Sequence, residues 1–492
     1  MVFSSAAFLF AFLPLTLGGY YLLPGKARNV FLTLMSLLFY AWGEPKFVFI
    51  MILSIFMNYS FGLLVARREE EKYQKIIITL MVICNLSLFF VFKYLNFTIE
   101  NLNILFGGIL PQTHITLPIG ISFFTFQAMS YVFDVAMGRG KVQKNPLDVA
   151  LYVSLFPQLI AGPIVRYETV AEEIRGRKEN LSDFVRGTRR FIVGLAKKMI
   201  LSNSVGLLAD QAFGFSQASQ LSAAMAWLGA LAYAFQIYFD FGGYSDMAIG
   251  LGLMFGFHFD ENFNYPYIAR TVSEFWQRWH ISLSTWFRDY LFYTVSRRAT
   301  PLGKKVKARW GKTAGRLTPS VIALSVVWLS TGIWHGASWC YILWGVYYGI
   351  LLIAELILQP TTKKWIKKTG IDTNAPWFIG FQILRTMLLV LLGYVLFRST
   401  TLARAGQYFG AMFGLAGNAG VDAAALAALK NHTSALILCA IASTPVVGWA
   451  GKKLGRLGSS DGLKNALCLV LLILSAAYIV SSSYNPFIYF AF

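Results

Sequence analysis

The amino-acid sequence predicts an all-α polytopic membrane protein with about 11–13 transmembrane helices. Of its 492 residues, 56% are hydrophobic and only 13% are charged, whereas soluble domains are about 45–50% apolar and about 25% charged. The apolar residues gather in successive runs near the ~20 residues that a helix needs to cross a bilayer. An ordinary water-soluble enzyme is therefore excluded, and the lipid bilayer is the expected surrounding.

Charge placement orders the first five crossings. The net charge is +20, and the basic residues lie in short loops between apolar runs, as the positive-inside rule describes. A nucleic-acid partner is therefore not expected. Residues 6–23 have no basic residues before them, so they are predicted to be a first span and not a cleaved signal peptide. Placing the basic loops at 26–28, 67–68 and 139–144 in the cytoplasm puts the N-terminus outside.

Two apolar segments do not fit a simple crossing. Residues 149–165 lie between two basic loops, and Pro157 and Gly162-Pro163 interrupt them. One crossing cannot join two inside loops, and proline removes a helical hydrogen bond, so we predict a re-entrant segment. Residues 274–296 lead to a block with eight Lys/Arg and no acidic residue between Arg297 and Arg316. This segment is also expected to dip in and return, or to lie at the inner interface.

The remaining apolar segments complete a single membrane domain over residues 1–492, with core motifs at 117–360 and C-terminal helices at 376–492. One of them, 221–253, is expected to break at Gly242-Gly243. Both termini are expected outside. The predicted later spans are 191–209, 221–253, 321–334, 339–358, 377–397, 435–449 and 467–480.

Ionisable side chains at membrane depth are costly and usually line a cavity or relay protons. Asp240 and Asp246 flank the Gly242-Gly243 pair inside a long apolar stretch. Two interpretations remain open for them. They either cap the ends of a broken helix by accepting from free N–H groups, or they shape a reactive cavity.

A second cluster lies at 274–290, where five ionisable side chains fall within 16 residues. Glu274 and Arg278 are spaced for an i, i+4 pair. A continuous helix would place Trp276, His280, Leu283 and Phe287 on one face. The segment is either an amphipathic interfacial helix with tryptophan anchors or a cytoplasm-facing tunnel wall. In the second case its arginines suit phosphates or a thioester-carrier head group.

The third cluster surrounds His335, which stands in a tryptophan-rich span between Gly332 and Gly336. A hydrogen-bonded core histidine is one interpretation. Burial also favours the neutral imidazole that a general base needs, which makes His335 the strongest catalytic candidate. The sequence contains no His-Glu-x-x-His, Walker, Rossmann or Gly-x-Ser-x-Gly motif. A metal site, a nucleotide-driven pump and a serine-type hydrolase therefore have no support.

These motifs resemble the membrane-bound O-acyltransferase (MBOAT) superfamily, and the match is closest to its alginate O-acetylation branch. The resemblance covers nearly the whole chain. The core motifs are 238–249, Asn262-Phe263 with Pro266-Tyr267, 275–290 and 328–336. Further matching segments are 1–5, 39–42, 117–123, 156–164 and 486–490.

The resemblance implies a ring of helices with re-entrant segments around a central tunnel. It places the catalytic histidines at His335 and His280. An acyl thioester, acetyl-CoA or a related acyl carrier, would enter from the cytoplasm as substrate, with no bound cofactor, and His335 would help deprotonate the acceptor hydroxyl. The implied product is an acetylated exopolysaccharide or cell-wall polymer, completed by an extracytoplasmic SGNH-hydrolase-like partner at the bacterial cytoplasmic membrane. The substrate-binding candidates are Arg278, Trp279, Ser282, Arg288, Asp289, Trp334, Asp240 and Asp246.

One departure from the branch affects the substrate. After Asp289-Tyr290 many members continue with Tyr-Ile-Pro-Leu-Gly-Gly, whereas this chain continues with Leu291 and becomes strongly basic. Alginate is therefore not assumed as the acceptor. The basic block at 297–316 either meets the anionic donor or anchors the inner side. D-alanyl transfer to teichoic acid and a proton-coupled transporter or scramblase are the alternative functions.

Overall fold

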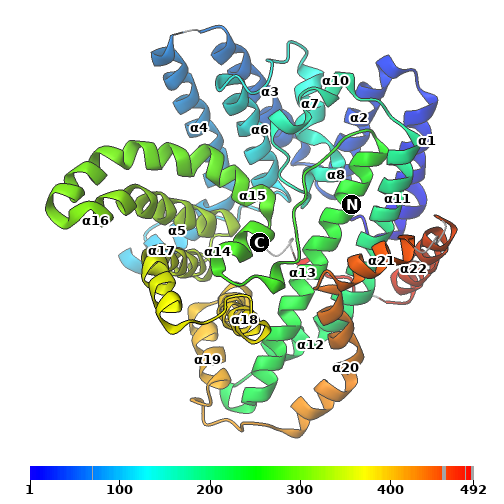
Figure 1. Ribbon diagram of the computed structural model, residues 1–492. Helices are drawn as coiled ribbons and strands as arrows, with labels where there is room; N and C mark the ends of the chain where they lie inside the picture. Colours follow the sequence, from blue (N-terminus) through cyan, green and yellow to red (C-terminus); the bar gives the residue numbers. More distant parts are fainter. Residues whose placement is uncertain (69, 457–460, 483, 489–492) are drawn as a thin grey trace. The chain divides into compact units, whose positions relative to one another are not determined.

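All regular secondary structure in the described part of the chain is helical, as the sequence predicts (Figure 1). The computed structural model describes residues 1–68, 70–456, 461–482 and 484–488. Eight helices within these residues are long and apolar enough to cross a membrane, and Phe8–Leu22 is apolar but shorter. A polytopic membrane protein is thus confirmed. The helices that satisfy this length are fewer than the 11–13 predicted crossings, partly because α6 (Ile121–Ala136) has only 16 residues.

The contacts divide the chain into two units. Unit 1 comprises the described residues of Met1–Ile200, Phe241–Glu261 and Lys464–Ala491. Its helices are η1 (Phe8–Phe12), α1 (Leu13–Leu22), α2 (Gly25–Gly43), α3 (Val48–Ala66), α4 (Glu71–Lys93), α5 (Leu95–Phe106), α6, α7 (Pro146–Ser154), α8 (Phe156–Leu159), α9 (Tyr167–Val170), α10 (Glu173–Gly176), α11 (Leu181–Ala196), η2 (Lys197–Ser202, which ends in unit 2) and most of α22 (Asp461–Ser481).

Unit 2 comprises the described residues of Leu201–Asp240 and Asn262–Leu463. Helix α13 (Ala223–Met254) belongs to unit 2 up to Asp240 and to unit 1 beyond it. The other helices of unit 2 are α12 (Asn203–Phe213), η3 (Ala218–Gln220), η4 (Pro266–Ile268), α14 (Val272–Arg278), α15 (Ile281–Trp286), η5 (Phe287–Phe292), α16 (Tyr293–His335), α17 (Trp339–Thr369), α18 (Pro376–Arg398), α19 (Leu402–Met412), α20 (Ala423–Ala442) and α21 (Val446–Arg456).

Both segments that the charge pattern singled out are broken. Residues 146–176 form the four short helices α7 to α10, and Pro157 lies in the first turn of α8. Residues 272–292 form α14, α15 and η5, with a break at Trp279 and His280. The side chain of Thr271 accepts a hydrogen bond from the Glu274 N–H and so begins α14, which is the usual way in which threonine starts a helix.

The predicted break at Gly242-Gly243 is wrong, because α13 runs through it without interruption. Neither Asp240 nor Asp246 therefore caps a broken helix end. The glycine serves close packing within unit 1 instead: a Cβ at Gly243 would lie 2.7 Å from the carbonyl oxygen of Gly194 on α11. Small residues allow such close approach between membrane helices.

The predicted span at 435–449 is also wrong. Helix α20 begins at Ala423, where the side chain of Asp422 caps it, and ends at Ala442. Helix α21 starts anew at Val446, directly after Pro445. A proline has no N–H to continue the hydrogen bonding of the preceding helix, so the apolar run at 435–449 contains a helix boundary.

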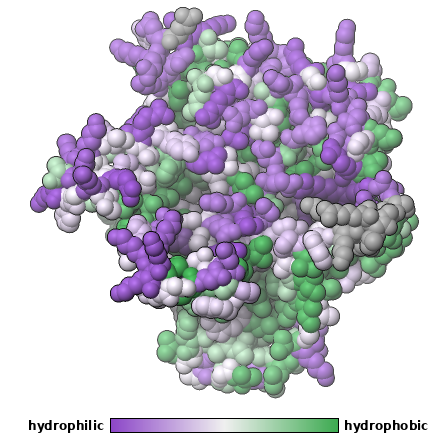
Figure 2. All heavy atoms as spheres, viewed as in Figure 1, coloured by the Kyte–Doolittle hydropathy of each residue, from purple (hydrophilic) through white to green (hydrophobic). Residues whose placement is uncertain are grey.

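The basic block at 297–316 is helical. Helix α16 doubles back on itself (Figure 1), and its non-helical residue Gly311 has φ 89°. The two arms pack tightly, since a Cβ at Gly303 would lie 2.7 Å from the carbonyl oxygen of Gly315. All eight basic side chains of the block are exposed, and hydrophilic residues cover the outer turns of this hairpin (Figure 2).

Candidate active site

The pair α16 and α17 positions His335. Helix α16 ends at His335, and the Ser338 side chain then caps α17 by accepting from the Cys340 N–H at 3.3 Å. The two helices meet at glycines: a Cβ at Gly332 would lie 2.5 Å from the Tyr341 carbonyl oxygen, and one at Gly345 would lie 2.4 Å from the Trp328 carbonyl oxygen. Larger residues do not fit at this crossing, so the glycines determine how closely the two helices approach beside His335.

Aromatic rings enclose the imidazole of His335, which is 7% exposed. The Trp344 ring meets it edge to face at 4.9 Å between centroids, and the Phe397 ring does so at 5.0 Å. Tyr341 lies at 6.4 Å. This surrounding excludes bulk water, which strengthens every electrostatic interaction that the imidazole makes.

His280 occupies a strained position between α14 and α15. Its backbone is left-handed, with φ 45° and ψ 53°, a conformation that costs a non-glycine residue roughly 1–2 kcal/mol. Backbone hydrogen bonds hold it there. The Ile281 N–H donates to the Asn262 carbonyl at 3.0 Å, and the Asn264 N–H donates to the Arg278 carbonyl at 2.9 Å.

The predicted single helical face through 274–290 is therefore wrong. The break at His280 ends the helical spacing that would have placed Trp276, His280, Leu283 and Phe287 together. The predicted i, i+4 pair lies before the break and is confirmed, since Arg278 donates to Glu274 at 2.8 Å.

The two candidate histidines both lie beside one tryptophan. The Trp334 ring is 6.0 Å from the His280 ring and 4.9 Å from the His335 ring, centroid to centroid. Two buried histidines that are 55 positions apart in the sequence thus contact the same ring within unit 2. Two imidazoles in a dry aromatic site can accept and pass on a proton.

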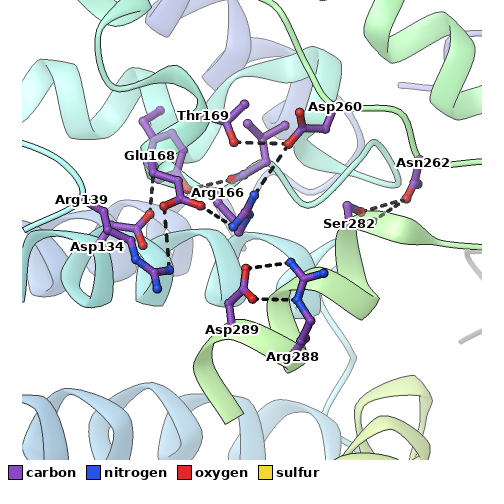
Figure 3. A network of polar contacts seen from close by, with 12 residues as sticks. Asp134, Arg139, Arg166, Glu168, Thr169, Asp260, Asn262, Ser282, Arg288 and Asp289 are labelled. Atoms are coloured by element: carbon purple, nitrogen blue, oxygen red, sulfur yellow. Dashed lines mark hydrogen bonds and ion pairs between the residues drawn. The ribbon is translucent and has the colours of Figure 1, made fainter. Parts of the chain in front are cut away.

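A cavity of about 570 Å³ lies among α14, α15, η5, α16 and α17. Its walls include Trp276, Phe287 and Trp328, and Arg288 is the cation on its lining. Arg288 forms a two-pronged pair with Asp289 at 2.8 and 3.3 Å (Figure 3). The volume falls within the range of small-molecule sites.

A model of the membrane-bound O-acyltransferase (MBOAT) family matches residues 141–396, more than half of the chain. The chain belongs to this family. It is thus a multi-pass membrane O-acyltransferase, and the matched region contains both buried histidines.

Three relatives of this O-acyltransferase illustrate the alginate O-acetylation branch and its neighbours. The protein named "Probable alginate O-acetylase AlgI" of Pseudomonas putida is 38% identical over 100% of both chains. Its namesake in Pseudomonas syringae is 42% identical over 84% of this chain and 75% of its own. The peptidoglycan O-acetyltransferase of Helicobacter pylori is 31% identical over 100% of this chain and 98% of its own. The resemblance to the alginate branch is confirmed.

The other predicted site residues of the O-acyltransferase have different surroundings. Trp279 is 6% exposed and stacks on Phe275 and Tyr267 in the core of unit 2. The Ser282 hydroxyl donates to the side chain of Asn262 at 2.9 Å (Figure 3). Asp240 is buried in the unit 2 part of α13.

Asp246 lies in unit 1, where it is part of an ion-pair cluster. Its carboxylate accepts from Arg190 at 2.8 Å and from Lys197 at 2.7 Å. Figure 3 shows a second unit 1 network, in which Glu168 pairs with Arg139 and Arg166. Paired charges of this kind link helices within unit 1.

His258, in the loop after α13, also makes ion pairs. Its Nδ1 lies 2.6 Å from Glu173 and its Nε2 lies 3.3 Å from Asp183. Partial burial lowers the pKa of His258, but the hydrogen bonds and charges of the two carboxylates outweigh this effect and raise the pKa above its ordinary value.

Two residues of the candidate site are not predicted by the sequence motifs. Asn262 belongs to a family motif, but its contact with His280 depends on a backbone pairing that no local spacing reveals. Glu355 on α17 accepts from the Val272 N–H at 2.8 Å and from the Ser273 N–H at 2.9 Å. It thereby satisfies the first N–H groups of α14. The available signal was an acidic residue inside an apolar span.

Proposed function

We propose that this O-acyltransferase moves an acetyl group from a cytoplasmic thioester, acetyl-CoA or another acyl thioester, across the bacterial cytoplasmic membrane. The acceptor is a hydroxyl of an extracytoplasmic exopolysaccharide or cell-wall polymer. The observation that carries the proposal is the placement of two buried histidines, His280 and His335, beside the same Trp334 ring. The names of the relatives support acetyl as the group and a polymer as the acceptor.

The chemistry requires the transfer of one proton and the replacement of the thioester sulfur by the hydroxyl oxygen at the carbonyl carbon. His335 accepts the proton of the acceptor hydroxyl while the hydroxyl oxygen forms a bond to the thioester carbonyl carbon. The carbon–sulfur bond then breaks, and the departing thiolate receives the proton, so that ester and thiol are the products. A general base supplies about 10²–10⁴-fold of rate, and alignment of the two substrates supplies much of the remainder.

Arg288 on the lining of the 570 Å³ cavity is a candidate contact for the phosphates of the donor. Its side chain is 54% exposed, and a planar guanidinium suits phosphate oxygens. Arg278 and the exposed basic block at 297–316 are further candidates for contact with the donor phosphates. The alternative role of the block is to anchor the cytoplasmic side of the protein at the membrane. An extracytoplasmic SGNH-hydrolase-like partner is proposed to complete the transfer to polymer.

D-alanyl transfer to teichoic acid is the second candidate, because His335 would serve as the general base in the same way. The donor in that reaction is an aminoacylated carrier. Donor chemistry separates the two functions. The first releases CoA or a related thiol, and the second consumes an aminoacylated carrier.

The experiment compares the wild type with His335→Ala and His114→Ala in membranes supplied with labelled acetyl-CoA and the extracytoplasmic fraction. His114 is exposed and serves as the matched control. The expected result is transfer of label by the wild type and the control, and a loss of at least ~100-fold in His335→Ala. An intact thioester in all three, or equal transfer by all three, would contradict the proposal.

A further inference from the structure

The side chain of Asn262 lies directly against His280. Both residues are buried, at 0% and 1% exposure. The Asn262 Oδ1 is 3.1 Å from the His280 Nδ1. The same oxygen accepts from the Ser282 backbone N–H at 3.2 Å and from the Ser282 hydroxyl at 2.9 Å. One amide oxygen thus contacts three polar groups of two residues, His280 and Ser282, in the turn that holds His280.

These contacts determine the orientation of the Asn262 side-chain amide, that is, which of its two terminal atoms is the oxygen. A backbone N–H is only a donor, so the Asn262 atom that faces Ser282 must be the oxygen. The His280 Nδ1 faces this same oxygen and must therefore carry the proton. A neutral imidazole has one N–H and one lone pair, so the lone pair is at Nε2.

We infer that Asn262 is a positioning residue that holds His280 in its Nδ1–H tautomer and presents Nε2 as a proton acceptor. The backbone supports this role, because the Asn262 carbonyl accepts from the Ile281 N–H at 3.0 Å and so secures the left-handed turn at His280. A strained backbone persists only where its surroundings hold it.

The catalytic consequence rests on the proposed function. Beside Trp334, a neutral His280 can accept a proton or a hydrogen bond through Nε2 but cannot donate one from that atom. His280 would then assist removal of the hydroxyl proton together with His335. With the opposite tautomer, His280 would instead donate to the thioester or to the leaving thiol.

The test uses the full-length protein in lipid and three variants. Asn262→Leu removes the oxygen, Asn262→Asp retains an oxygen acceptor and adds charge, and Asn374→Leu changes an exposed asparagine in the loop between α17 and α18. Acetyl transfer is measured from acidic to alkaline pH, and unfolding temperatures report folding. Separately, ¹⁵N NMR of histidine-labelled protein reads the tautomer of His280, whose signal is assigned by its loss in His280→Gln.

The expected kcat of Asn262→Leu is lower by about 100-fold or more with little change in KM, and Asn374→Leu matches the wild type. Asn262→Asp is expected to restore most of the rate and to move the acidic limb of the pH profile upward, because a carboxylate favours the imidazolium. The ¹⁵N spectrum should report a protonated Nδ1. Two results would overturn the inference. One is a protonated Nε2 on neutral His280 in the wild type. The other is an Asn262→Asp variant that is as slow as Asn262→Leu and has an unshifted pH profile. Since the NMR reading needs no activity, it remains decisive even if acetyl transfer is not the reaction.

Discussion

Substituting Gly345 by alanine tests whether the close crossing of α16 and α17 positions His335. A Cβ at Gly345 would lie 2.4 Å from the Trp328 carbonyl oxygen and 3.0 Å from the Gly332 Cα. Ordinary contacts at a Cβ begin at 3.4 Å. The obstructing atoms belong to the backbone and cannot rotate away, so the helices must separate by about 1 Å. Trp328 and His335 are on the same helix, so the imidazole moves with it.

A displacement of about 1 Å at a reacting group can cost about 10²-fold in rate. We therefore expect Gly345→Ala to lower kcat by about 100-fold and to destabilise the protein by about 1–3 kcal/mol through overpacking. Gly349→Ala is the matched control one turn further along α17, since its Cβ would meet only the Trp328 side chain, at 3.2 Å. Relieving this contact requires a shift of only a few tenths of an ångström, so the control should stay within about threefold of the wild type.

The assay is transfer from labelled acetyl-CoA, with equal amounts of folded protein checked by their unfolding temperature. Equal rates in Gly345→Ala and Gly349→Ala, whether both fast or both slow, would refute the reasoning. A slow Gly345→Ala whose unfolding temperature equals that of the control would locate the whole effect in the position of His335.

Three further predictions concern the surroundings of the site. Glu355→Gln should lower the free energy of unfolding by about 2–3 kcal/mol, because it weakens charge-assisted bonds to the start of α14; an unchanged denaturation curve would argue against this. The raised pKa of His258 means that its ion pairs stabilise the folded protein fully below about pH 6.5 and lose this effect as pH rises through the folded pKa. The stability difference between the wild type and His258→Gln should therefore shrink at alkaline pH, and a difference that grows would be contrary. If the basic block meets the donor, Arg297→Glu combined with Arg298→Glu should raise KM for acetyl-CoA, whereas unchanged donor binding leaves only the anchor role.

Much of the architecture could be predicted because it follows from local properties. Loop charges located the interruptions at 149–165 and 274–296, and Pro157 is in fact in the first turn of a short new helix. The pair Glu274–Arg278 followed from helical spacing alone. The choice of His335 as the catalytic candidate follows from the cost of burying an ionisable group, and the burial itself is confirmed.

The remaining features depend on residues far apart in the chain. Gly242-Gly243 suggested a break, but the packing of Gly243 against Gly194 explains these residues in an unbroken helix. The left-handed turn at His280 requires backbone bonds to 262–264. Glu355 caps a helix that begins more than 80 residues earlier. No local pattern contains such contacts.

The central claim is that an acyl group passes from a cytoplasmic thioester to an extracytoplasmic hydroxyl with the help of His335. The most direct measurement supplies labelled acetyl-CoA to the outer, cytoplasmic face of sealed inside-out vesicles that contain acceptor polymer and the extracytoplasmic fraction in the lumen. The account predicts label on lumenal polymer with the wild type and a loss of at least ~100-fold with His335→Ala. Label that reaches the polymer equally in both, or that appears only when the vesicles are opened, would contradict it.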